Sequence, residues 1–217
     1  GDVVERAKAR LRAMPVAGSS RRKQGARTLE DEDPAQVDPL TGLSTRRVLE
    51  QGLVAAFERT RAGGGPMILA LVEIDDLAGI RREYGADGTD ALLIGAARRI
   101  EDPFDRTEAV VSRFEESGRF AVLLVGEDAR EGIQRIERAR RAFAENPVQL
   151  IAGSNNAPDS ASATVCVGAS VLDAGAVGRF SDTSQILAMT EKALAAAQAV
   201  GPHTVRVYSP GQDRAAA

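Results

Sequence analysis

Two groups of acidic residues are placed where carboxylates could hold divalent cations. Glu73, Asp75 and Asp76 close a compact apolar run, and Glu115 and Glu116 lie between two short apolar runs. If the first run is a strand and the later two form an adjacent hairpin, these acids could hold metal ions against a triphosphate for nucleotidyl transfer. Strand ends and turns are also where Asp and Glu ordinarily meet water, and spacing alone favours that simpler explanation.

The sequence around these acids resembles the GGDEF domains of bacterial diguanylate cyclases. Residues 38–47, Asp-Pro-Leu-Thr-Gly-Leu-Ser-Thr-Arg-Arg, are similar to the Asp-x-Leu-Thr-Gly-Leu-x-Asn-Arg-Arg motif that opens this domain. Residues 69–90 look like its first strand and substrate helix, and Arg113-Phe114 precedes the expected hairpin. The resemblance covers residues 38–208. It implies an α/β (α+β) sandwich with a polymerase-palm-like central mixed sheet flanked by helices.

The catalytic signature departs from the family pattern. Residues 115–120 read Glu-Glu-Ser-Gly-Arg-Phe in place of Gly-Gly-Asp/Glu-Glu-Phe, so the segment is one residue longer and lacks the paired glycines that let the backbone approach guanosine phosphates. Glu73 replaces the metal-binding Asp, although Mg²⁺ demands near-ideal geometry at about 2.1 Å. We therefore expect Glu73, Glu115 and Glu116 to be degenerate counterparts of catalytic residues, with no metal or cofactor bound.

The resemblance also implies a loss of phosphate-binding cations. Ala78 and Gln198 stand where the family has Lys, and Pro202 stands where it has Arg. Such cations supply several kcal/mol of barrier reduction in phosphoryl-type transfer. Arg81 replaces the guanine-reading Asn and can only donate hydrogen bonds, whereas its partner persists as Asp90. Asp90 is thus a candidate nucleotide-binding residue.

The inhibitory product site of the family, Arg-x-x-Asp, is half present. Arg106 occupies the Arg position, while Ala109 occupies the Asp position with Glu108 beside it. An Arg can stack on guanine and pair with phosphate, which makes Arg106 a second candidate nucleotide-binding residue. An ordinary solvated Arg at a strand entry is the simpler interpretation and is favoured.

Periodicity predicts the elements that would position these residues. Helices are expected at 44–61, 77–84, 89–100, 129–144 and 183–199, and strands at 67–75, 109–114, 120–125, 163–172 and 204–208. The two strands around Glu115 and Glu116 read as a hairpin. We expect one sheet covered mostly on one face by helices, with crossovers that return to parallel neighbours.

The chain before this domain has a different character. Val4, Ala7, Leu11 and Met14 form a heptad-like seam, which predicts a helix over residues 1–14. Residues 15–37 read as a flexible linker, residues 38–208 as the domain, and residues 209–217 as a tail. The helix would connect the domain to a protein partner, an upstream sensor or a second copy of the chain.

Composition narrows the class of protein further. Among 217 residues, 28 basic and 31 acidic side chains give a net charge of −3, so no global field draws in nucleic acid or an anionic membrane. One cysteine, Cys166, and one histidine, His203, exclude a disulfide framework, and both are expected to be structural. No apolar run of about 18 residues could span a bilayer, and a cytoplasmic location is expected.

Together these features predict a catalytically inactive GGDEF-like domain that acts as a signalling or protein-interaction module in bacteria. Two alternatives remain open from the sequence. The domain could bind cyclic di-GMP through Arg106, or it could be a GTP-binding regulator with weak or no cyclase activity, which Asp90 favours slightly.

Overall fold

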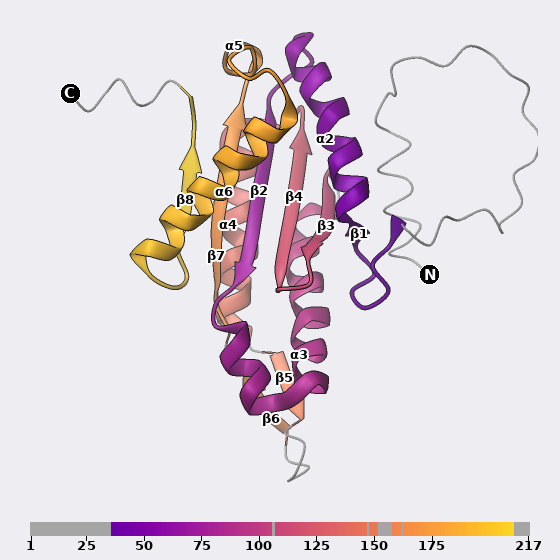
Figure 1. The fold of residues 1–217 in the computed structure, drawn as a ribbon, viewed down its shortest axis with the longest axis vertical. Helices are drawn as coiled ribbons and strands as arrows, with labels where there is room; N and C mark the ends of the chain where they lie inside the picture. The colour runs from indigo at the N-terminus through magenta and orange to yellow at the C-terminus, as the bar shows by residue number, and fades with distance from the viewer. Residues whose placement is uncertain (1–35, 106, 147, 152–157, 162, 211–217) are drawn as a thin grey trace, which may run out of the picture.

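The computed structural model describes residues 36–210 except 106, 147, 152–157 and 162 (Figure 1). The expected N-terminal helix, most of the expected linker and Arg106 lie outside the described residues. The elements before the central hairpin are β1 (Ser44–Thr45), α2 (Arg46–Arg61), β2 (Met67–Ile74), α3 (Leu77–Glu101) and the short 3₁₀ helix η2 (Asp102–Phe104). The hairpin is β3 (Val110–Glu115) with β4 (Arg119–Val125), and α4 (Ala129–Glu145), β5 (Val148–Ile151), β6 (Pro158–Ala161), β7 (Val165–Leu172), α5 (Ala174–Val177), α6 (Thr183–Val200) and β8 (Val205–Tyr208) follow.

The main sheet has six strands in the order β1-β3-β4-β2-β7-β8. Strand β2 runs antiparallel to both of its neighbours, β4 and β7, and β3 is antiparallel to β4. Parallel pairing in the described sheet is confined to the edges, where β1 meets β3 and β7 meets β8. The expected hairpin and mixed sheet are therefore confirmed. Of the long helical crossovers between the described strands, only the one through α6 returns to a parallel neighbour.

Helices cover both faces of this sheet, so the expectation of one mostly covered face is wrong (Figure 1). Helices α3 and α4 contribute Leu92 and Phe143 to the core on one face. Helices α2 and α6 contribute Leu53 and Ile186 to the core on the other face. The physical reason lies in β2, whose residues 67–72 are apolar and all buried. A strand without polar alternation must be covered on both sides.

Helix α6 packs unusually close to β7 because β7 carries a glycine at the crossing. A Cβ added at Gly168 would lie 2.1 Å from the backbone nitrogen of Leu194, closer than real Cβ atoms come to any neighbour. Helix α3 contains the two helices predicted between residues 77 and 100, which meet at a kink. The kink is at Gly85, with φ of 71° and ψ of −165°.

The loop before α2 is fixed by one carboxylate. Asp38 accepts hydrogen bonds from the backbone nitrogen of Thr41 at 2.8 Å and from its Oγ1 at 2.6 Å. The same carboxylate pairs with Arg113 of β3 at 3.3 Å. The motif at residues 38–43 thereby anchors the start of the domain to the strand that leads into the hairpin. Among the described residues, no helix combines the length and apolarity needed to cross a bilayer.

Candidate functional site

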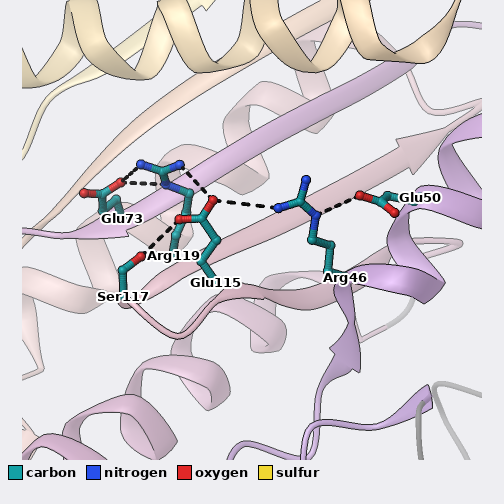
Figure 2. Close-up of polar contacts among 6 residues, drawn as sticks. All are labelled: Arg46, Glu50, Glu73, Glu115, Ser117 and Arg119. Atoms are coloured by element: carbon teal, nitrogen blue, oxygen red, sulfur yellow. Dashed lines mark hydrogen bonds and ion pairs between the residues drawn. The ribbon is translucent and has the colours of Figure 1, made fainter.

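Strand register places an arginine between the two acidic positions that the sequence singled out. Strand β4 lies between β2 and β3, and its first residue, Arg119, pairs with Glu73 of β2 and with Glu115 of β3. Opposite residues on neighbouring strands have Cβ atoms about 5 Å apart, within reach of long side chains. The fold therefore sets a cation between two carboxylates at one end of the sheet (Figure 2).

The guanidinium of Arg119 contacts both carboxylates. Its Nε and Nη2 lie 2.7 and 2.6 Å from Oε2 of Glu73, and its Nη1 lies 3.4 Å from Oε1 of Glu115. The side chains of Arg119, Glu73 and Glu115 are 22%, 23% and 35% exposed, so the pairs are partly shielded from water. Short charge-assisted hydrogen bonds of this kind are among the strongest polar contacts in proteins.

The ion pairs continue from the hairpin to helix α2. Nη1 of Arg46 lies 3.9 Å from Oε1 of Glu115, and its Nε donates to Glu50 at 2.7 Å. The Arg46 guanidinium also lies 4.3 Å from the ring centroid of Phe114. Ser117 donates to the second oxygen of Glu115 at 3.2 Å. Charges thus alternate from β2 across β4 and β3 to the first turn of α2, as Figure 2 shows.

The other acids at the end of β2 are bound to protein donors. Asp75 accepts hydrogen bonds from Oγ1 of Thr164 at 2.6 Å and from the backbone nitrogen of His203 at 2.9 Å. Asp76 caps α3 by accepting from the nitrogen of Gly79 at 3.0 Å. Among the described residues, no three His, Cys, Asp or Glu side chains are grouped so that they could hold a metal ion. Because Oε2 of Glu73 already accepts from Arg119, the residues here do not fit the divalent cation that the family resemblance implies.

A cleft of about 400 Å³ lies beside the hairpin. Its lining includes Arg81, Asp90 and Glu116 together with Ala78. The fold therefore brings three of the polar residues considered above around one space, while Glu73 and Glu115 are joined to Arg119. Ala78, which stands at a family Lys position, contributes only a methyl group. Gln198 and Pro202, which the family resemblance places at two further cation positions, are exposed.

The single cysteine and the single histidine lie near Asp75. Cys166 is 1% exposed, as expected for a buried thiol, and its Sγ donates to the carbonyl of Gly201 at 3.3 Å. Burial raises the pKa of this thiol. His203 has φ of 59°, and its Nδ1 is buried without a hydrogen-bond partner. Burial, reinforced by the charge of Arg140, lowers the pKa of this imidazole.

Arg119 is the residue that sequence reasoning missed. It directly precedes Phe120, at the place where the family signature has Glu before Phe, so the sequence already carried a charge reversal. Counting the antiparallel register back from the hairpin turn would have placed this cation opposite Glu115. Arg106, which the family resemblance places at the inhibitory site, lies outside the described residues.

Comparisons with known proteins agree with this fold. The family model described as "Diguanylate cyclase, GGDEF domain" matches residues 35–201. Diguanylate cyclase DgcP of Pseudomonas aeruginosa is 32% identical over 120 residues, which are 55% of this chain and 18% of that protein. An uncharacterized signaling protein of Caulobacter vibrioides is 34% identical over 67 residues, which are 31% of this chain and 8% of that protein. The chain thus spans less than a fifth of either relative.

Solved structures show the same architecture. The GGDEF domain of DgcB from Caulobacter crescentus, in complex with c-di-GMP, has a TM-score of 0.70 at 21% identity, over 86% of this chain and 98% of that one. Diguanylate cyclase SiaD from Pseudomonas aeruginosa, in complex with its activator SiaC, has a TM-score of 0.68 at 25% identity, over 80% of this chain and 61% of that one. With its family model matched over residues 35–201 of 217, the chain belongs to the GGDEF-domain family of diguanylate cyclases.

Proposed function

We propose that this chain is a catalytically inactive GGDEF domain of a bacterial signalling protein, and that its output is binding to a protein partner. One observation carries the proposal: the guanidinium of Arg119 is bonded to both Glu73 and Glu115. Glu73 stands where the family resemblance places the metal-binding Asp, and Glu115 lies in the hairpin that replaces the catalytic signature. The domain would keep the architecture of a diguanylate cyclase without its chemistry.

An arginine cannot substitute for the catalytic metal. A divalent ion holds the triphosphate and stabilises charge on the attacking and leaving oxygens through open coordination positions. A guanidinium has five N–H donors and stays protonated in proteins. It therefore has no open coordination position for a phosphate oxygen and cannot activate a nucleophile. The methyl group of Ala78 in the cleft adds no positive charge there. Phosphoryl-type transfer depends mostly on positioning and charge stabilisation, both of which are weakened here.

Product analysis tests the absence of catalysis. Incubation of the chain with GTP and either Mg²⁺ or Mn²⁺ should give no cyclic di-GMP above background when the products are separated by chromatography. An active diguanylate cyclase in the same buffers is the positive control. Steady formation of cyclic di-GMP that scales with the concentration of this chain would overturn the proposal.

One comparison and one expectation from the sequence support a protein partner as the output. The solved relative SiaD is in complex with its activator SiaC, so a domain of this architecture occurs in a protein with a protein regulator. The helix expected over residues 1–14 offers an apolar seam to such a partner, to an upstream sensor or to a second copy of the chain. Cross-linking in the native bacterium, followed by identification of the captured protein, would name the partner.

Nucleotide binding without turnover is the second candidate, and the cleft favours it. Arg81 and Asp90 both line this space, so it offers hydrogen-bond donors and acceptors for a base. Calorimetry against GTP, with and without Mg²⁺, should then show binding that is lost in Asp90→Ala and kept in Asp87→Ala, an exposed acid of the same helix. Cyclic di-GMP binding that is lost in Arg106→Ala would instead select the effector function. The absence of a heat of binding with both GTP and cyclic di-GMP would favour the protein-interaction module.

A further inference from the structure

We propose that the guanidinium of Arg119 is a permanent internal cation that takes the place of a divalent ion between Glu73 and Glu115, and that this acid pair accepts a metal only when Arg119 is removed. The inference rests on the proposed function, because it gives the reason why the same site has lost its chemistry. It adds a property that inactivity alone does not imply. The ends of β2, β4 and β3 are joined through Arg119 at any concentration of divalent cations.

Geometry makes the arginine and a metal ion compete for the same oxygen atoms of Glu73 and Glu115. Two nitrogens of Arg119 lie 2.7 and 2.6 Å from Oε2 of Glu73. A bound Mg²⁺ would need that oxygen at about 2.1 Å and a Ca²⁺ ion would need it at about 2.4 Å, in the space that these nitrogens fill. The third contact, from Nη1 to Glu115 at 3.4 Å, covers the side facing the hairpin. A metal that bridges Oε2 of Glu73 and Oε1 of Glu115 could enter only after the guanidinium had left.

Charge balance points the same way. Glu73 and Glu115 face one another across β4 and would repel without a cation between them. Arg119 neutralises one of these charges, and Arg46, which pairs more closely with Glu50, lies 3.9 Å from Glu115. A guanidinium keeps its charge throughout the physiological pH range, whereas a metal ion binds and leaves. The internal cation therefore removes a dependence on solution ions that an open acid pair would have.

Thermal denaturation and manganese binding test the inference together. In the unaltered chain, Tm should be the same in EDTA and in millimolar Mg²⁺, Ca²⁺ or Mn²⁺, and Mn²⁺ titration followed by electron paramagnetic resonance should show no site that depends on Glu73. In Arg119→Met, Tm in EDTA should fall because Glu73 loses its counter-ion and Glu115 keeps only Arg46, at 3.9 Å. Mn²⁺ at tenfold excess over its dissociation constant should then raise Tm by about 4 °C.

Two further variants make the test specific. Glu73→Gln combined with Arg119→Met should lose the Mn²⁺ response, because one of the two ligands is gone. Arg59→Met, which breaks an ion pair to Glu108 on another part of the surface, should show no Mn²⁺ response. If Arg119→Met unfolds in EDTA, Arg119→Gln is the second variant. If that variant also unfolds, recovery of folding on addition of Mn²⁺ supports the inference, and failure to recover overturns it.

The inference and the proposed function fail in different ways. A Mn²⁺ site in the unaltered chain that disappears in Glu73→Gln would overturn the internal cation, even if no cyclic di-GMP forms. An Arg119→Met variant that folds without a metal response would also overturn it. Formation of cyclic di-GMP by an unaltered chain whose Tm ignores divalent ions would overturn the proposed inactivity alone.

Discussion

Individual residues in this domain hold loops through partly buried charges. Asp38 joins the loop before α2 to Arg113 on β3, and their side chains are 17% and 12% exposed. The Nε of Arg113 is buried without a hydrogen-bond partner, so Asp38 is the counter-ion of a guanidinium that is already imperfectly satisfied. A charge left unpaired at this depth is costly, whereas exposed ion pairs contribute little.

Asp38→Asn should therefore lower the free energy of unfolding by about 2–3 kcal/mol, since it leaves the Arg113 charge without its counter-ion. Urea denaturation followed by circular dichroism measures this loss. Glu58→Gln is the matched control, because its pair with Arg61 spans 3.9 Å on the exposed side of α2 and should change stability little. Equal effects of both variants would show that burial of the Asp38 pair does not matter.

His203 gives the domain a defined response to acid. Its pKa is lowered from 6.5 by burial and by Arg140 and Arg141 of α4, against the opposing charges of Asp75 and Glu137. The folded state therefore binds a proton less readily than the unfolded chain. The stability that neutral His203 contributes is fully present above pH 6.5 and is lost as pH falls through 6.5 towards its folded pKa.

His203→Asn should flatten this part of the pH profile. Asn tolerates the left-handed backbone at this position and does not titrate. Between about pH 7.5 and 5.5 the unaltered chain should lose more unfolding free energy than the variant, as measured by urea denaturation at each pH. Parallel losses in the two proteins would mean that other groups carry the acid response.

At the residue scale, the sequence predicted the composition of the site but not its contacts. The family resemblance directed attention to Glu73 as an altered metal ligand and to Glu115 as part of a rebuilt hairpin, but it did not connect the two residues. Their common partner, Arg119, depends on strand register, which sets which side chains meet across β4. Loss of an expected residue was easier to notice in the sequence than gain of an opposite charge.

At the scale of elements, close packing of α6 on β7 depends on Gly168. Any side chain at this position would collide with the backbone of α6 at Leu194, and a backbone cannot rotate away as a flexible side chain can. Gly178, after α5, gives a matched control, because a Cβ added there would have its nearest neighbour 4.0 Å away. The two glycines differ in what surrounds them rather than in chain flexibility.

Gly168→Ala should destabilise the domain by about 3 kcal/mol, because overpacking forces α6 away from the sheet. Gly178→Ala should be close to neutral. Chemical denaturation of both variants measures the difference. A Gly168→Ala variant as stable as the unaltered chain would show that α6 can shift on β7 without loss of core contacts.

Long elements were predictable, whereas among the four-residue elements of the described chain only β8 was predicted. The helix expected at 183–199 corresponds to α6, and the strand expected at 163–172 corresponds to β7. Helix α5 and strands β5 and β6 have four residues each, too few to produce a recognisable period. The covered second face was not predicted, although the unbroken apolar run at 67–72 indicates burial on both sides.

At the scale of the whole molecule, self-association is a prediction from the sequence alone. Two heptads at residues 4–14 are too short for an independent coiled coil, since isolated helices below about 12–15 residues are marginal in water. A second copy of the chain could bury their apolar seam. The described domain begins at residue 36, so this prediction concerns residues outside it.

We expect a concentration-dependent dimer that weakens in Leu11→Glu, because a charge in the seam would be buried without a partner. Sedimentation equilibrium over a wide concentration range measures this, and Arg10→Glu, outside the seam, is the control. A strict monomer at high concentration, or a dimer whose stability does not change in Leu11→Glu, would show that the seam has no role in self-association.

Because Cys166 is buried, chemical labelling of its thiol can be used to measure local opening of the fold. Because this is the only thiol in the chain and it donates to Gly201 at the turn between α6 and β8, a thiol reagent can reach it only when that region opens. The rate of labelling therefore measures the free energy of local opening, separately from global unfolding. An engineered probe is unnecessary, and the binding of a partner near this turn would be detected as slower labelling.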